Sequence, residues 1–197
     1  MNPAPSPQFI RDRLDAARRL RHEREGYRHA AVLIPLVGTD GDWEVVLTRR
    51  NGDLPHHRGQ IAFPGGSADV GETCVQAALR EAQEEIGLDP ARVDVLGCHD
   101  DIWTPSGFII SPVVGILAGY GPFVPNPDEV ARVFSVPLSF FADERQAQRQ
   151  VLRHEGVDRD VYFYRWDGET IWGATALILR NFLSLLGLID DRRRFLA

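Results

Sequence analysis

Near the N-terminus, hydrophobic residues recur every three to four positions. They lie among many Arg, Asp and Glu side chains, as expected for the buried face of an amphipathic helix. The apolar members of this pattern are Ile10, Leu14, Ala17 and Leu20. The spacing predicts a leading helix, an N-terminal extension over about residues 8–25, with its arginines on a solvated face.

Strand-like apolar runs follow this segment. The runs over residues 29–37 and 43–48 flank the turn signal Asp40–Gly41, and we expect them to pair as a β-hairpin. Further strand-like runs cover residues 93–98, 108–117, 130–136 and 161–166.

Two later segments return to helical spacing. In the first, Thr73 followed by Gln76 forms a capping box and Gly87 provides a natural end, which predicts a helix over residues 73–86. The second, over residues 171–188, is expected to be a closing helix. The predicted buried stripes are Val75, Leu79, Ala82 and Ile86 on the first helix, and Trp172, Ala176, Leu179, Leu183 and Leu186 on the second. Mixed strands and helices in this order favour an α+β sandwich, with residues 1–197 forming a single domain.

Composition is that of an ordinary globular domain. The chain has 197 residues, of which 44% are hydrophobic, enough to bury a core without cross-links. All 22 Lys+Arg residues are arginine, so there is no lysine for a Schiff base or for P-loop phosphate binding. A polyanionic ligand would have to be held by arginine, histidine, backbone N–H groups or a metal ion.

Charge and cysteine content narrow the expected partners. The net charge of −6 argues against general nucleic-acid binding, which depends on a basic surface. Cys74 and Cys98 are the two cysteines, too few for a dense disulfide framework. The sequence has neither a signal-peptide pattern nor an apolar run of ~20 residues. We therefore expect a cytoplasmic protein that acts on a small molecule and has no membrane or nucleic-acid partner. Its oligomeric state is left open.

Three glutamates gather on one face of the helix predicted over residues 73–86. Glu81, Glu84 and Glu85 are spaced i, i+3 and i+4, so they lie within about one turn of each other. Such a cluster either extends into solvent, with Arg80 pairing to Glu84, or holds a hard divalent cation that offsets the mutual repulsion. Oxygen ligands suit Mg²⁺ or Mn²⁺, but the spacing alone leaves both interpretations open.

The residues around these glutamates form a longer motif. It reads Gly66-x5-Glu72-x7-Arg80-Glu81-Ala82-x-Glu84-Glu85-x-Gly87-Leu88. This string is similar to the Nudix box, and a chance match has a probability on the order of 10⁻⁸ per start position. The chain therefore resembles a Nudix hydrolase. The resemblance implies a Nudix-type α/β/α sandwich with a mixed sheet and a metal-binding loop and helix, and cleavage of a nucleoside diphosphate linked to another moiety.

The resemblance also implies roles for the motif residues. Glu81 and Glu85 would be the principal ligands of Mg²⁺ or Mn²⁺, Glu84 a further ligand or an acid/base partner, and the Gly65 carbonyl a backbone ligand. Bound cations would neutralise the pyrophosphate oxygens and lower the pKa of an attacking water. The residues with an expected structural role in the motif are Gly66, Glu72, Arg80 and Gly87.

The general base is less closely defined by the motif. Nudix enzymes often recruit a glutamate from outside the box, and a loop rich in Pro and Gly delivers Asp128 and Glu129 just before a strand-like run. Glu129 is our candidate, while Asp128, Glu84 and Glu81 remain possible. The alternative is that Asp128 and Glu129 form a solvated loop end.

A second motif lies immediately upstream. It reads Val46-Leu47-Thr48-Arg49-Arg50-Asn51-x3-Pro55-x3-Gly59-x3-Phe63-Pro64-Gly65-Gly66 and resembles the signature of the coenzyme A pyrophosphatase subfamily. The departures are Val46 for Leu, Asn51 for a small residue and Pro55 for Arg. The last puts one phosphate contact in doubt. The segment stays basic through its Arg and His side chains, and guanidinium groups pair well with phosphate. The candidate substrate-binding residues are Arg49, Arg50, His57 and Arg58.

This resemblance implies hydrolysis of coenzyme A or an acyl-CoA to 3′,5′-ADP and (acyl-)4′-phosphopantetheine. One alternative is a Nudix hydrolase acting on NADH, ADP-ribose or a nucleoside triphosphate, because the box specifies the chemistry and not the leaving group. Another is a non-catalytic Nudix-fold binding module. The intact set of motif glutamates disfavours that second alternative.

Overall fold

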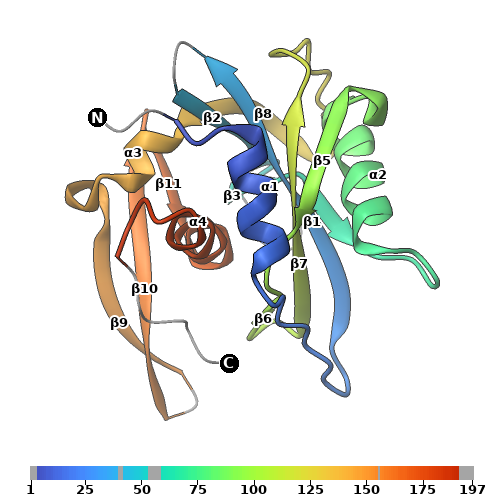
Figure 1. Cartoon of the computed structure of the whole chain (residues 1–197). Helices are drawn as coiled ribbons and strands as arrows, with labels where there is room; N and C mark the ends of the chain where they lie inside the picture. Colours follow the sequence, from blue (N-terminus) through green and yellow to red (C-terminus); the bar gives the residue numbers. More distant parts are fainter. Residues whose placement is uncertain (1–3, 40–41, 53–58, 155, 191–197) are drawn as a thin grey trace.

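A mixed β-sheet forms the centre of the molecule (Figure 1). The computed structural model describes residues 4–39, 42–52, 59–154 and 156–190. The strand order is β3-β2-β1-β7-β5, with β4 paired to β1, β6 to β7 and β8 to β2. Strands β1 and β7 run parallel and the other pairs of this sheet are antiparallel. The strands are β1 (Arg28–Thr39), β2 (Asp42–Arg50), β3 (Ile61–Ala62), β4 (Gly65–Ser67), β5 (Val93–Cys98), β6 (Ile102–Thr104), β7 (Phe108–Leu117) and β8 (Val130–Pro137).

Each face of this sheet buries a separate hydrophobic cluster. Alternate residues of β1 point to opposite faces, as the pleat requires, so Leu33 and Ile34 belong to different clusters. Helix α2 (Cys74–Ile86) covers one face, and α1 (Pro7–Ala16) and α4 (Gly173–Leu185) cover the other. This α/β/α layering agrees with the predicted fold class. The predicted hairpin is β1 paired with β2.

A second, three-stranded antiparallel sheet lies beside α4 (Figure 1). It consists of β9 (Gln148–His154), β10 (Val157–Trp166) and β11 (Glu169–Trp172), and the short helix α3 (Leu138–Ala142) precedes it. Its core side is anchored by Tyr164 and Ile171, which are both fully buried. Short 3₁₀ turns occupy Pro90–Arg92 and Glu144–Gln146. No helix in the described ranges is long and apolar enough to cross a membrane.

The predicted leading helix is wrong over its second half. Helix α1 ends at Ala16, and Ala17 is extended. The chain then binds to two aspartates instead of continuing the helix: the Leu20 N–H donates to Asp100 and the His22 N–H to Asp101. Leu20, predicted to be buried, is 43% exposed.

Two predicted helical faces also need correction. The closing helix begins at Gly173, because residues 171 and 172 belong to β11, and Trp172 is exposed. On α2 the buried face is Ala77, Ala78, Ala82, Glu85 and Ile86. Val75 and Leu79, which we expected in the stripe, are only half-buried. Small alanines allow α2 to approach the sheet closely, which brings Glu85 into the interior.

Candidate active site

Helix α2 carries the motif glutamates, and its ends are fixed by local contacts. The Thr73 hydroxyl accepts a hydrogen bond from the Gln76 N–H while the Gln76 side chain accepts one from the Thr73 N–H, so the predicted capping box is present. At the other end, Gly87 adopts a left-handed conformation with φ of 65° and its N–H bonds to the last carbonyls of the helix. A side chain at Gly87 would also press against Val124.

The glycine loop before α2 lies directly against two of these glutamates. The Gly65 N–H donates to Glu85 Oε2 at 3.1 Å. At Gly66, an added Cβ would collide with the carboxylate of Glu81. Strand β4, which contains both glycines, pairs with β1, so the sheet holds the loop in this position. The absence of a side chain at Gly66 therefore leaves room for the Glu81 carboxylate, while at Gly65 an added Cβ would collide with the backbone of β1.

Glu85 is a buried acid. Its 3% exposure leaves little contact with water, and this burial raises the pKa of its carboxyl to about 7, with the nearby Glu81 and Glu129 adding to the rise. The Gly65 N–H and Arg50 oppose this effect, and Arg50 Nη1 lies 3.6 Å from Glu85 Oε1. When Glu85 is ionised, the Gly65 N–H and Arg50 therefore offset only part of the cost of burying its negative charge.

Arg80 joins the loop to the helix. Its guanidinium pairs with Glu72 at 3.0 Å, with Glu81 at 2.9 Å and with Glu84 at 3.0 Å, and it also donates to the Ser67 carbonyl at 2.9 Å. Glu72 in turn accepts from the Asp69 N–H, and Arg80 and this N–H lower its pKa. These contacts are what we would expect if Glu72 and Arg80 had the structural role suggested by the motif. Glu84, with its side chain 55% exposed, is the outermost of the three helix glutamates.

Glu129, the candidate base from outside the motif, lies close enough to influence the others. Burial is the main cause of the raised pKa of Glu81, and Glu84 and Glu129 add repulsion that raises it further. The residue after β2 fixes the backbone of Glu129, because the Asn51 N–H donates to the Glu129 carbonyl at 2.8 Å. Asp128 is exposed at the adjacent position.

An arginine pair lies on two neighbouring strands of the sheet, β2 and β8. Arg49 on β2 and Arg132 on β8 are cross-strand partners, and both approach Glu169 Oε1, at 3.3 and 3.4 Å. Arg132 also pairs with Asp167 at 2.7 Å. The sequence motifs did not predict Arg132, because this residue lies far from both motifs in the chain. Its pairing with Arg49 depends on the register of β2 and β8, which the sequence does not specify.

The predicted contacts His57 and Arg58 lie outside the described residues, as does Pro55. The structure brings together the glycine loop, the glutamates of α2, Arg50 and Glu129. Arg49 instead pairs with Glu169 on β11.

Comparison with known families places this geometry in context. Residues 27–155 match the family model described as NUDIX domain, which covers the glycine loop, α2, Arg49 and Glu129. The chain belongs to the Nudix family. It is 42% identical over 156 residues to a protein of Pectobacterium atrosepticum described as an uncharacterized Nudix hydrolase NudL, a match covering 78% of this chain and 80% of that protein. A protein of Yersinia pestis with the same description is 37% identical over 155 residues, covering 78% and 77%.

Solved structures agree with the fold. The Nudix hydrolase RenU of M. smegmatis superimposes with a TM-score of 0.51 at 28% identity, covering 61% of this chain and 76% of its own. A protein of Deinococcus radiodurans, 15% identical, has a TM-score of 0.54 over 85% of this chain and 88% of its own, and this second likeness concerns the fold alone. The chain is thus a Nudix hydrolase, an enzyme acting on small diphosphate-bearing substrates.

Nudix hydrolases generally use divalent cations such as Mg²⁺ or Mn²⁺, and the residues of this site fit such an ion by donor type. Within the described ranges, no group of three His, Cys, Asp or Glu side chains is arranged to hold a metal ion, and Glu81 and Glu84 pair with Arg80. However, carboxylate and carbonyl oxygens are the donors that hard cations prefer. The incompletely compensated charge of Glu85 and the mutual repulsion of Glu81 and Glu85 are what a cation would relieve.

Proposed function

We propose that this enzyme hydrolyses coenzyme A or an acyl-CoA to 3′,5′-ADP and (acyl-)4′-phosphopantetheine. The observation that supports this most strongly is the placement of Arg50 beside the motif glutamate Glu85. Arg50 lies 3.6 Å from Glu85, and the preceding residue Arg49 is the cross-strand partner of Arg132. Coenzyme A carries a 3′-phosphate in addition to its pyrophosphate, so it needs cationic contacts outside the glutamate cluster.

In this proposal the glutamates bind the pyrophosphate through metal ions, and the arginines bind the peripheral phosphate. Glu81, Glu85, Glu84 and the Gly65 carbonyl would hold Mg²⁺ or Mn²⁺, which when bound would neutralise the pyrophosphate and acidify the attacking water. Glu129 would accept the proton from that water, because its neighbours Glu81 and Glu85 are committed to the cation. Arg80 and Glu72 would keep the loop in register with α2.

Arg49 and Arg132 would bind the peripheral 3′-phosphate. Each is about two-fifths exposed and both approach the same oxygen of Glu169, while Arg132 has Asp167 as a second counterion. A phosphate with several acceptor oxygens would satisfy both groups better than Glu169 does. His57 and Arg58 belong to the same proposed contact set on sequence grounds.

The test compares kcat/KM for coenzyme A and for 3′-dephospho-coenzyme A. We expect the wild type to prefer coenzyme A by about tenfold or more, since one charge-assisted contact to phosphate contributes on the order of 1.5–3 kcal/mol. Arg49→Gln and Arg132→Gln should each reduce this preference. Arg165→Gln is the matched control, since Arg165 is exposed on the second sheet.

Equal rates for the two substrates would refute the phosphate contact. Faster hydrolysis of NADH, ADP-ribose or a nucleoside triphosphate than of coenzyme A would transfer the enzyme to one of these alternative substrate classes. Binding of coenzyme A without any product in the presence of Mg²⁺ would favour the non-catalytic module.

A further inference from the structure

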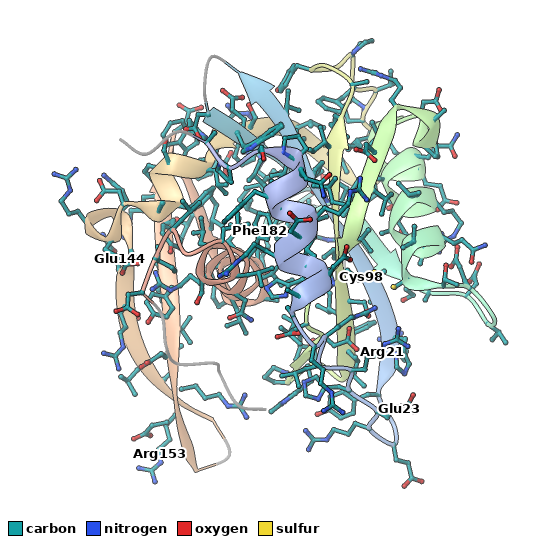
Figure 2. All side chains as sticks on the ribbon, viewed as in Figure 1. Arg21, Glu23, Cys98, Glu144, Arg153 and Phe182 are labelled. Atoms are coloured by element: carbon teal, nitrogen blue, oxygen red, sulfur yellow. The ribbon has the colours of Figure 1, made fainter. Side chains whose placement is uncertain are left out.

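The two cysteines of the chain lie close together at the N-terminal end of α2, at the opposite end of the helix from Glu85. Cys74 is the first residue of α2 and Cys98 is the last residue of β5, and their sulfurs lie 3.4 Å apart. Both are free thiols and both are half-buried. Figure 2 shows Cys98 in the region between α1 and α2.

The surroundings of the pair favour a thiolate on Cys74. The hydrogen bond between the two sulfurs is the main cause of the lowered pKa of Cys74, and Arg19 lowers it further. Arg19 Nη1 lies 3.6 Å from Cys74 Sγ. Because Cys74 is the first residue of its helix, the unpaired N–H groups of the first turn also favour a negative charge there. The same hydrogen bond raises the pKa of Cys98, so the two sulfurs are chemically unequal.

Arg19 is held in place by hydrogen bonds to Asp101 and Ser111. Its Nη2 donates to Asp101 at 2.6 Å and to the Ser111 hydroxyl at 2.9 Å, and Asp101 also accepts from the His22 N–H. The segment after α1 therefore contacts the cysteine pair through Arg19, while its Arg21 and Glu23 side chains extend outward (Figure 2). Asp101 opposes the thiolate electrostatically, but it also fixes the guanidinium that stabilises it.

We propose that Cys74 and Cys98 are a redox-active pair that a hydroperoxide converts reversibly to an intramolecular disulfide. The Cys74 thiolate attacks the peroxide oxygen, the O–O bond breaks, and Cys74 becomes a sulfenic acid with loss of hydroxide. Cys98 then attacks the Cys74 sulfur, the S–O bond breaks, and water leaves with the proton of the Cys98 thiol. Overall two thiols lose two electrons and two protons to the peroxide, and a small dithiol restores them by exchange.

The geometry makes Cys98 the resolving partner. A disulfide needs the sulfurs about 2.05 Å apart, so the pair must approach by about 1.4 Å from its 3.4 Å separation. The bond would join α2 to β5 and close a loop across the sequence separation of 24 residues, so the oxidised protein should unfold at a temperature about 5–10 °C higher than the reduced protein.

The experiment treats the reduced full-length enzyme with hydrogen peroxide, blocks the remaining thiols by alkylation, and maps the peptides by mass spectrometry. We expect a Cys74–Cys98 disulfide in the monomer, formed faster than free cysteine reacts, and reversed by dithiothreitol. Cys98→Ser should instead accumulate a sulfenic acid at Cys74 that dimedone traps. Cys74→Ser should react no faster than free cysteine, because burial also raises the pKa of Cys98.

Arg19→Gln tests the electrostatic part with Arg18→Gln as its control, because Arg18 is an exposed arginine at the adjacent position. The first should slow oxidation by about threefold or more, and the second should leave the rate unchanged. Direct over-oxidation of Cys74 in the wild type, a disulfide between two chains, or a wild-type rate no faster than free cysteine would each overturn the proposal. These results can be read from the wild type alone, even if a variant fails to fold.

Discussion

Among single residues, Glu85 and Gly66 carry the most information about the site. Glu85 is an acid placed where a hydrophobic residue would ordinarily lie on the buried face of a helix. The cost of burying it is only partly offset by one backbone N–H and by Arg50 at 3.6 Å. A cation bound by this site would offset the remainder, so the metal-free stability of the protein should report on the role of Glu85.

Glu85→Gln should stabilise the metal-free protein at pH 8. The pKa of Glu85 in the folded chain, about 7, is above its ordinary value of 4.5. Its contribution to stability is therefore complete below about pH 4.5 and is lost as the pH rises through about 7. Glutamine does not ionise, so the variant should gain about 1–3 kcal/mol at pH 8 relative to the wild type. Chemical denaturation in chelator at pH 5 and pH 8 measures this difference.

Glu84→Gln is the matched control, since Glu84 is over half exposed and its stability should change by less than about 0.5 kcal/mol. Adding Mg²⁺ should stabilise the wild type and leave Glu85→Gln unaffected, with turnover abolished in that variant. Normal turnover by Glu85→Gln, or no gain in stability at pH 8, would contradict the proposed metal role.

Gly66→Ala should give a folded but inactive protein. The new Cβ would occupy the space of the Glu81 carboxylate, and that flexible group can move aside at low cost in stability but no longer borders the loop. We expect kcat to fall by about a hundredfold or more, as for loss of a major transition-state contact, with the circular dichroism spectrum unchanged. Gly52→Ala, where an added Cβ meets nothing, should retain activity. Equal kinetics for the two variants would show that Glu81 is not required at this position.

At the scale of elements, α2 is the feature most completely predictable from the sequence. Its capping box and its terminal glycine are local signals, and the structure places both as expected. Strands β1, β2, β5, β7, β8 and β10 also follow from their apolar runs. By contrast, β9 is polar in sequence and pairs with β10 partly through ion pairs such as Arg149–Asp160, so hydrophobic patterning could not reveal it.

The segment after α1 is not helical, contrary to the prediction, for a related reason. Its helical spacing of apolar residues is real, but Asp100 and Asp101 offer hydrogen bonds to the extended backbone at Leu20 and His22. Such tertiary contacts outweigh the small differences in helix propensity, and the sequence of the segment itself does not disclose them.

Thr73→Ala should destabilise the protein through the start of α2. The variant removes the hydroxyl that accepts from the Gln76 N–H, and losing such a cap costs about 1 kcal/mol. For a chain of this size the midpoint of thermal unfolding should fall by about 2–4 °C. Differential scanning calorimetry checks this. Thr170→Ala, at an exposed threonine, should shift the midpoint by less, and equal shifts would argue against a capping contribution.

At the scale of the whole molecule, the site draws on segments that are distant in sequence. The motifs predicted the glycine loop and the helix glutamates, because those residues are contiguous. The neighbourhood of Arg49, Arg132 and Glu169 arises only when β8 pairs with β2 and β11 lies near β3. Local patterns do not specify these long-range pairings, so the sequence motifs did not predict Arg132 or Glu169 as neighbours of Arg49.

The most direct test of the central claim is product analysis of coenzyme A incubated with the enzyme and Mg²⁺ in H₂¹⁸O. The account predicts 3′,5′-ADP and 4′-phosphopantetheine, with one ¹⁸O atom in one of the two products, no product in chelator, and none with Glu85→Gln. Intact coenzyme A under conditions where another nucleoside diphosphate derivative is cleaved, or cleavage that persists in Glu85→Gln, would contradict it.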